Sequence, residues 1–342
     1  MLKQYKTYGM FGLLFILLIL SIVAGTMFGG VTIPFSDTVL VLLNVLPFFD
    51  FDIASKYETI LLQIRLPRVL VAGVIGAGLA VAGVVMQSIF RNPMADPGII
   101  GVSSGGAFGG VIAIYFGFTA IGSFMVPLLG FIGALLTLFL VYVISTHNGK
   151  TSILTLLLTG VAISSFLSAC SSLIITYADL GQLQQILYWL MGDLNGRDWE
   201  HLQLLILPVL FSCSIFYLYR NELDILLLGE EEARNLGINV QRTRNLLLIV
   251  ASLLTGVSVS LTGAIGFVGL IVPHMIRLMI GPSHRYLIPA SILGGAVFLI
   301  VADLIARLVI KPAEIQIGII TAFFGAPFFI YLILLNNRKE LK

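Results

Sequence analysis

The sequence predicts an all-α, polytopic membrane protein of about ten transmembrane helices per subunit. Of its 342 residues, 58% are hydrophobic and only 11% are charged, whereas a soluble domain carries about 25% charged residues. The mean hydropathy is +1.05. Apolar runs recur along the whole chain, and several reach the roughly 20 residues that a helix needs to cross a bilayer. Lipid is therefore the expected main solvent of this chain.

Apolar runs bounded by charged residues, proline or glycine predict the spans 10–30, 66–89, 98–117, 122–145, 152–177, 202–219, 245–264, 267–280, 285–306 and 315–335. The first run exceeds the 7–15 apolar residues of a signal peptide, so we expect a retained helix. The eighth is short and bent by Pro273. An even number of spans places both termini on one side, and about two thirds of the Lys and Arg residues then fall on that side. Because these residues accumulate in cytoplasmic loops, we expect cytoplasmic termini and a location in the cytoplasmic membrane.

Three segments are long enough to act outside the bilayer. Residues 31–64 contain a moderately apolar stretch, Thr38–Leu46, which predicts a helix lying at the interface on the outer side. Residues 178–200 form a second outer segment, and residues 221–244 form the sizeable cytoplasmic loop. No Pro- or Ser-rich linker and no change in composition divides the chain, so we expect one membrane domain over residues 1–342.

The cytoplasmic loop 221–244 predicts a short amphipathic helix after an apolar lead-in, Ile225–Leu228. Acidic residues at the start of this helix favour its dipole, and Gly237 suits its C-terminal end. Glu230 and Arg234 stand at i,i+4 and can pair. The element could be a solvated connector, but its apolar lead-in favours docking on another surface.

The sequence offers no group of residues that could perform enzyme chemistry. The four histidines are scattered, the two cysteines lie in apolar runs, and neither a metal site nor a Ser-His-acid group can be built. Gly149-Lys150-Thr151 resembles the end of a phosphate-binding loop, but Ile144 stands where that motif requires glycine. We therefore expect no catalytic residue, and any ATP to be used by a partner.

Ion-coupled transport also has little support, because ionisable residues in the spans are scarce. Asp303 is the clearest exception, and Arg307 follows it at i+4, so an ion pair on the helix explains it at least as well. A secondary transporter remains the first rival interpretation. An intramembrane enzyme is the second.

Two spans carry small or hydroxyl side chains on one face. The serines of the fifth span recur every three or four residues, and they can bond carbonyls of their own helix or line a wet passage: Ser164, Ser165, Ser168, Ser171 and Ser172. The tenth span adds Gly318, Thr321 and Gly325, a face that would leave room for a bulky solute. Glycines spaced by four in the third span, such as Gly101 and Gly105, predict close helix packing.

The motifs of the chain match one family in order. They are Arg65-Leu66-Pro67-Arg68, Gly83 to Gln87, Asn92-Pro93-Met94-Ala95-Asp96-Pro97-Gly98, Gly101-Val102-Ser103-Ser104-Gly105, Tyr188-Trp189-Leu190-Met191-Gly192, Leu228 to Leu236, Gly263 to His274, Ala302 to Arg307 and Gly325-Ala326-Pro327. With these motifs the chain resembles the FecCD-like permeases of type II ABC importers, which take up ferric siderophores, haem or cobalamin. The resemblance covers nearly the whole chain.

The resemblance implies a homodimer that moves its solute by alternating access, with the path on the dimer axis lined by the fifth and tenth spans. It implies two cytoplasmic ABC ATPases, which bind ATP and Mg²⁺ and dock on Gly229, Glu230, Glu231, Glu232, Ala233, Arg234, Leu236 and Gly237. It also implies an outer substrate-binding protein that docks on Arg65, Arg68 and Arg307, and a cytoplasmic gate at Thr151 and Ser152. The expected solute is a ferric siderophore, with haem or cobalamin as the alternative.

Overall fold

The computed structural model describes residues 2–31, 33–44, 48, 51, 55–147, 150–311 and 313–340. Over these residues the chain is helical apart from one short hairpin. The elements are α1 Leu2–Met27, α2 Phe35–Asn44, α3 Ser55–Thr59, the π-helical η1 Ile60–Arg65, α4 Leu66–Ile89, η2 Pro97–Ile100, α5 Val102–Tyr115, η3 Phe118–Ala120, α6 Met125–Ser145, β1 Thr146–His147, β2 Lys150–Thr151, α7 Ile153–Tyr177, α8 Leu180–Met191, α9 Trp199–Leu218, α10 Arg220–Leu226, α11 Glu230–Asn235, α12 Val240–Thr262, α13 Val268–Ile280, α14 His284–Leu308 and α15 Ile317–Glu340.

Ten apolar helices confirm the predicted polytopic membrane fold. Within the described residues, seven helices are long and apolar enough to cross a membrane, and Val102–Tyr115, Val268–Ile280 and Ile317–Tyr331 are shorter apolar helices. The third predicted span is shorter than expected. Pro97 opens a 3₁₀ turn, and Gly101 with φ +84° ends it, so α5 begins at Val102.

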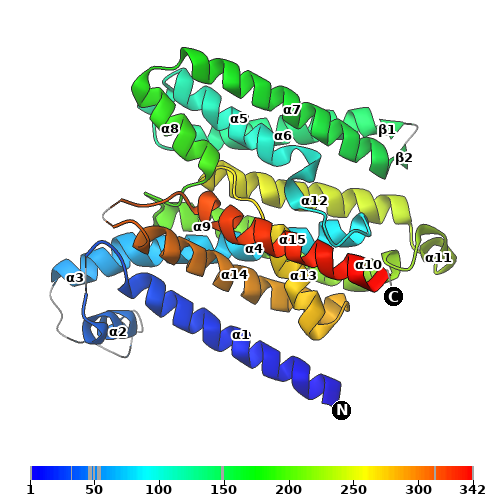
Figure 1. Cartoon of the computed structure of the whole chain (residues 1–342), viewed down its shortest axis with the longest axis horizontal. Helices are drawn as coiled ribbons and strands as arrows, with labels where there is room; N and C mark the ends of the chain where they lie inside the picture. Colours follow the sequence, from blue (N-terminus) through cyan, green and yellow to red (C-terminus); the bar gives the residue numbers. More distant parts are fainter. Residues whose placement is uncertain are drawn as a thin grey trace.

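The two ends of the bundle carry different elements (Figure 1). The β1–β2 hairpin, α10, α11, the start of α1 and the end of α15 lie at one end, here called the coupling end after the ATPase coupling expected of its loop. The opposite end carries α2, α3 and α8 and is here called the docking end, after the docking expected there. Both termini thus lie at one end, as an even number of spans requires.

The segments predicted to lie outside the bilayer correspond to elements of the structure that have different bounds. The predicted interfacial helix Thr38–Leu46 corresponds to α2, Phe35–Asn44, while Val45 and Leu46 lie outside the described residues. The second segment predicted to lie outside, 178–200, contains α8. The loop predicted to be cytoplasmic, 221–244, is shorter than expected, because α12 already begins at Val240.

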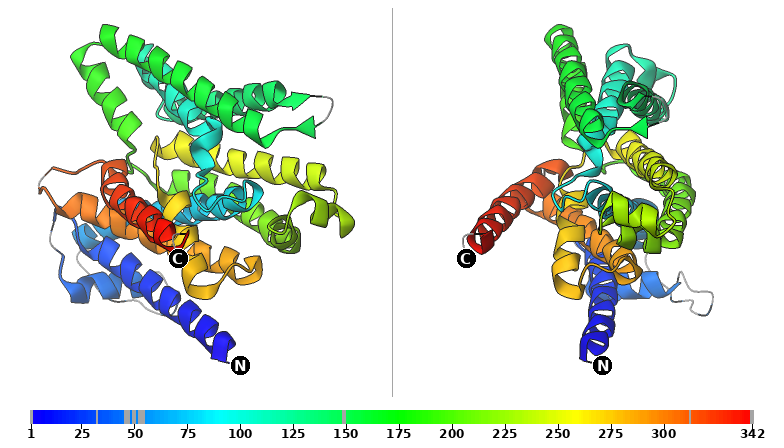
Figure 2. Two further views of the ribbon diagram at one scale, coloured as in Figure 1. Left: turned by 45° about the vertical axis from the view of Figure 1, so that its right-hand side comes forward. Right: turned by 90° about the vertical axis from the view of Figure 1, so that its right-hand side faces the viewer.

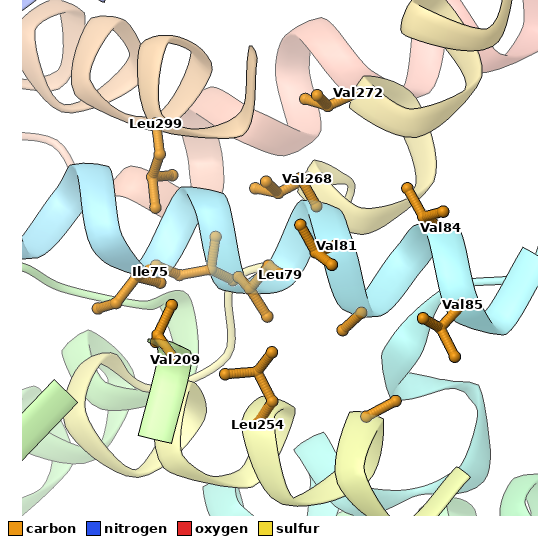
Figure 3. Close-up of a cluster of buried hydrophobic side chains, with 14 of the residues drawn as sticks. Ile75, Leu79, Val81, Val84, Val85, Val209, Leu254, Val268, Val272 and Leu299 are labelled. Atoms are coloured by element: carbon orange, nitrogen blue, oxygen red, sulfur yellow. The ribbon is translucent and has the colours of Figure 1, made fainter. Parts of the chain in front are cut away.

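Helix α4 forms the centre of the molecule (Figure 3). Of the most apolar window of the span Lys56–Ile89, which includes α4, 89% is buried. The side chains of α4 pack between Val209 of α9 and Leu254 of α12 on one side and Val268 of α13 and Leu299 of α14 on the other. A Cβ atom at Gly76 would overlap the carbonyl oxygen of Gly295 in α14. Glycine thus lets these two backbones meet, as small residues do between helices in lipid.

Helices α7 and α15 are among those at the periphery of the bundle. Helix α7 packs with α5 and α6 but has only 11% of its apolar window buried, and α15 projects away from the bundle (Figure 2). Large apolar side chains such as Leu158 and Phe166 of α7 are exposed. In a membrane such faces are covered by lipid or by another subunit.

Candidate functional site

The helix predicted to meet the partner ATPases is α11, Glu230–Asn235. Its Ala233 is fully buried against Leu226 of α10 and Val240 of α12, so the helix is anchored to the chain. Glu231, Glu232, Arg234 and Leu236 point outward and are exposed. The helix therefore presents an acidic face with one leucine to the surroundings.

The bounds of α11 follow its sequence signals. Gly229 precedes it with φ +139°, and Gly237 follows it with φ +83° and donates its N–H to the Arg234 carbonyl at 2.9 Å. Glu230 and Arg234 form the predicted i,i+4 ion pair at 3.5 Å. The apolar lead-in is mostly used inside the chain, since Leu226 is buried and Leu228 is exposed.

The predicted gate residues Thr151 and Ser152 connect a hairpin to α7. Thr151 is buried in β2 and pairs across the hairpin with Thr146, with their hydroxyl oxygens 2.9 Å apart. Ser152 is the N-cap of α7, and its hydroxyl accepts the Thr155 N–H at 3.3 Å. Serine is a preferred residue at this position. The sequence did not predict the hairpin.

A buried arginine lies between these two regions. The guanidinium of Arg244 in α12 donates to Glu230 Oε1 at 2.6 Å, to Gln241 Oε1 at 2.8 Å and to the carbonyl oxygen of Thr151 at 2.5 Å. The sequence counted this residue only as one of the cytoplasmic positive charges. Its role as a junction depends on contacts that are distant along the chain.

The three arginines predicted to face a binding protein are buried at the docking end. Arg65 is 6% exposed, Arg68 8% and Arg307 5%. These side chains are thus largely covered within the chain itself. Their docking role itself stays a prediction, and it would require acids of the binding protein to replace the present partners.

Those partners lie within the chain. Arg68 donates to Asp303 at 3.0 Å and to Glu314 at 2.8 Å. Arg307 forms an ion pair with Asp303 at 2.9 Å and donates to the carbonyls of Gly25 and Phe28, each at 3.0 Å. The predicted Asp303–Arg307 pair is confirmed, although it is buried and not on a helix surface.

Arg65 completes this cluster at the end of α1. Its guanidinium donates to the carbonyl of Met27 at 2.7 Å and also to those of Thr26 and Val31. The last carbonyls of a helix have no partner within the helix and carry partial negative charge. Arg65 and Arg307 thus cap the C-terminus of α1, which explains why positive side chains are buried here.

The serines of α7 serve both uses that the sequence left open, and two of them serve both at once. Ser165, Ser171 and Ser172 donate to carbonyls four residues earlier, at 2.9, 3.0 and 3.0 Å. Ser168, Ser171 and Ser172 also line a pocket of about 310 Å³ together with Ser103 and Ser104 of α5. Ser164 and Ser165 do not line this pocket. A hydroxyl-lined hollow thus lies between α5 and α7.

The small residues of α15 do not leave room beside the helix. A Cβ at Gly318 would overlap the carbonyl oxygen of Met191, and one at Gly325 would overlap the ring of Phe267. The Thr321 side chain is fully buried. The prediction of space for a solute along this face is wrong in this structure, because α8 and the residue preceding α13 already fill it.

A Ser-His-Asp arrangement, which sequence reasoning could not build, joins three elements at the coupling end. His284 lies 2.6 Å from the Ser88 hydroxyl of α4 and 2.6 Å from Asp224 of α10. Ser88 and His284 are completely buried, and Ser88 also donates to the Val84 carbonyl at 2.8 Å. No substrate can reach this serine in the structure, so the arrangement ties α10 to the bundle.

The Asp224 carboxylate titrates under two opposed influences. Burial raises its pKa, and hydrogen bonds from the His284 side chain and backbone lower it, so that the net pKa lies below its ordinary value. Among the described residues, no group of three His, Cys, Asp or Glu side chains is placed to hold a metal ion.

Comparison with known proteins places this geometry in one family. The model of the FecCD transport family matches residues 14–335. The cobalamin import system permease protein BtuC of Halobacterium salinarum is 46% identical over 285 residues, which cover 83% of this chain and 76% of the relative. The hemin transport system permease protein HmuU of Yersinia pestis is 40% identical over 282 residues, covering 82% and 84%.

Further similarity extends to another solute and to a solved structure. The molybdate import system permease protein MolB of Haemophilus influenzae is 41% identical over 279 residues, covering 81% of this chain and 82% of the relative. A solved structure of a metal-chelate type ABC transporter in an inward-facing conformation is 36% identical, with a TM-score of 0.83, and covers 95% of this chain and 98% of its own. The chain is thus a multi-pass membrane protein and not itself catalytic, and it belongs to the FecCD transport family, as a permease of type II, binding-protein-dependent ABC importers.

Proposed function

We propose that this permease moves a cobalamin-type metal chelate across the cytoplasmic membrane by alternating access. The observation that carries the choice of solute is the 46% identity, over 83% of the chain, to a relative named for cobalamin import. Hemin is the second candidate, since a relative 40% identical is named for its transport. None of the three relatives reported above is named for a siderophore, so the sequence-based expectation of a ferric siderophore has less support.

The hydroxyl-lined pocket between α5 and α7 supports a solute held weakly. Its lining combines five serines with Ala107, Ile175, Leu190 and Ala264. Such a surface offers hydrogen bonds and apolar contact without ionic pairing, and a mostly apolar lining with a few polar groups is typical of small-molecule sites. In this proposal, affinity for the solute resides mainly in the outer binding protein, and the permease provides a path of low affinity.

We place two ATPases against the exposed face of α11, one for each copy of a homodimer. The anchoring of Ala233 supports this assignment, because a helix held to α10 and α12 can pass a displacement into the bundle. The acidic residues and Leu236 on its outer face provide charge and apolar area for a partner. ATP and Mg²⁺ would be bound by the ATPases.

The same proposal puts both termini in the cytoplasm and the binding protein at the docking end. The shared position of the α1 and α15 ends with α11 supports this orientation (Figure 1). Arg68 and Arg307 contribute to docking only if acids of the binding protein displace Asp303 and Glu314, and Arg65 only if they displace the carbonyls at the end of α1.

Uptake by the reconstituted importer tests the function. Proteoliposomes would contain this permease and its ATPase, with ATP inside and no ion gradient, and would be supplied with binding protein and labelled cyanocobalamin, hemin or a ferric hydroxamate siderophore. We expect ATP-dependent accumulation of cyanocobalamin above the other two. Preferred accumulation of the siderophore would overturn the choice of solute, and accumulation that needs an ion gradient and no ATP would overturn the mechanism.

A further inference from the structure

The Arg244 side chain connects the helix assigned to ATPase coupling with the turn assigned to gating. It is 8% exposed, and its two terminal nitrogens bond different segments. Nη1 donates to Glu230, the first residue of α11, and Nη2 donates to the backbone oxygen of Thr151, at the end of β2. Thr151 is two residues before the start of α7, the helix that carries the serine-lined pocket.

Helix α12 is the element that both regions contact. In the described part of the chain α11 packs against α10 and α12, and β2 packs against β1 and α12. Arg244 projects from the second turn of α12. A displacement of α11 can thus reach the hairpin through a single side chain.

The chemistry of arginine suits such a junction. A planar guanidinium can donate to two acceptors at once in fixed directions, which the ammonium group of lysine cannot reproduce. A buried charge is costly unless it is paired and hydrogen-bonded, so Glu230 and the Thr151 carbonyl are held to it. The Nε–H of Arg244 is buried without a hydrogen-bond partner. This N–H therefore donates to none of the described groups in this conformation.

We propose that Arg244 is the positioning residue that transmits movement of α11 to the Thr151–Ser152 turn. The inference rests on the proposed function. When the ATPases displace α11, Glu230 shifts the guanidinium, and the Thr151 carbonyl follows it. Because Ser152 caps α7, the first turn of α7 moves with this carbonyl.

The decisive experiment compares solute uptake with ATP hydrolysis in the reconstituted complex. For Arg244→Gln we expect most of the uptake of cyanocobalamin per ATP hydrolysed to be lost, because movement of α11 no longer reaches the Thr151 carbonyl. Hydrolysis and the amount of ATPase that co-purifies should stay near wild type. Arg244→Lys should be intermediate, because it keeps the charge opposite Glu230 but cannot hold both acceptors. A proportional loss of uptake and hydrolysis, or an unchanged ratio, would overturn the proposal.

Arg285→Gln is the matched control. Arg285 is exposed at the start of α14, at the same end of the bundle, and its guanidinium lies over the neighbouring Tyr286 ring at 5.6 Å. The same loss of charge there should leave the ratio of uptake to hydrolysis unchanged. An equal fall in this control would show that any lost cation uncouples the complex, which overturns a specific role for Arg244.

A distance measurement follows the gate without solute. A spin label is attached through Leu154→Cys, at the exposed second residue of α7, after Cys170 and Cys213 are replaced by serine. In the otherwise wild-type complex, a non-hydrolysable ATP analogue with Mg²⁺ should change the distance between the labels of the two copies. In Arg244→Gln this change in distance should be lost or reduced. If the glutamine variant fails to assemble, Arg244→Lys takes its place and should show the same loss or reduction. A variant that responds like wild type would overturn the proposal.

Failure of the proposed function has a separate signature. A wild-type complex that hydrolyses ATP and accumulates none of the three probes would overturn the choice of solutes. The distance between the spin labels attached through Leu154→Cys in the two copies would still test whether Arg244 transmits the movement of α11. Loss of the nucleotide response in the variant alone supports the role of Arg244 whatever the solute is.

Discussion

Replacement of Asp303 by asparagine tests the cluster that joins α1, α4 and α14 at the docking end. The Asp303 side chain is 1% exposed and is the shared acid between two buried arginines. Arg68 lies 2.9 Å from one carboxylate oxygen of Asp303. Arg307 lies 2.9 Å from the other oxygen and forms an ion pair with it, but the two groups are not aligned as a hydrogen bond. Asparagine keeps the size of the side chain and removes its charge.

The expected loss follows from the charges that remain. Glu314 still pairs with Arg68, but it is 38% exposed and its interaction is weakened by solvent. Arg307 then keeps neutral acceptors, the carbonyls of Gly25 and Phe28 and the amide oxygen of the new asparagine, and no longer contacts an acid. Removing one member of a buried ion pair costs about 3–5 kcal/mol, because the opposite charge stays buried without compensation. We expect a fall in melting temperature of roughly 2 °C per kcal/mol for a chain of this size, or about 6–10 °C.

Thermal unfolding of the purified permease in detergent, followed by tryptophan fluorescence, measures this loss. Asp179→Asn is the control, since Asp179 is an exposed N-cap of α8 and asparagine caps equally well. The double variant Asp303→Asn with Arg307→Gln should recover part of the loss, because fewer unpaired charges remain. A melting temperature of Asp303→Asn within about 2 °C of the control would refute the reasoning, since it would correspond to about 1 kcal/mol or less.

Three further perturbations test other contacts. Gly110→Ala should lower the melting temperature by several degrees, because its Cβ would overlap the Trp189 indole, and overpacking costs about 1–3 kcal/mol; an unchanged melting temperature would show that α8 can shift. The hydrogen bonds with His284 leave Asp224 with a lowered pKa in the folded state. The ionised Asp224 therefore stabilises the fold above the unfolded-state pKa of about 3.9. This stabilisation is lost as the pH falls through the lower pKa of the folded state. The melting temperature should therefore decline more between pH 5 and pH 3 for wild type than for Asp224→Asn, and parallel curves would contradict this. Glu314→Gln removes a competing acid, so binding-protein affinity measured by surface plasmon resonance should rise if the arginine beside it takes part in docking, and an unchanged affinity argues against that role.

The membrane fold could be predicted because each span satisfies a local rule. A long run without charge, such as 122–145, becomes one helix wherever it lies in the bundle. The short helix α11 was also predictable, since Gly229, the acids after it and Gly237 are signals within ten residues of one another. The π-helical segment Ile60–Arg65 and the β1–β2 hairpin carried no such signal.

The environment of the charged residues could not be predicted in the same way. Sequence placed Arg65 at the start of a span, where a side chain commonly reaches toward the interface. The structure turns it toward the carbonyls at the end of α1, a contact across 38 residues to Met27. Arg68 and Asp303 are 235 residues apart along the chain. A pair at i,i+4, such as Asp303 and Arg307, is visible in one helix, whereas pairs between distant helices appear only when the bundle is assembled.

The predicted path residues of α7 and α15 also show that spacing along one helix does not identify what contacts it. The serine spacing of α7 correctly placed several hydroxyls on one side of a helix, three of which reach the pocket shared with α5. The glycines of α15 have an equally regular spacing, yet they accommodate Met191 and Phe267. Small residues permit close approach, and the sequence alone does not say whether a solute or another helix approaches.

In the proposed mechanism, partner ATPases move this permease, which has no energy source of its own. Uptake of labelled cyanocobalamin into proteoliposomes tests it, with the permease reconstituted alone or together with its ATPase and binding protein, and with or without an ion gradient. We predict accumulation against a concentration gradient only when the ATPase and ATP are both present. Accumulation by the permease alone, driven by an ion gradient, would contradict this mechanism.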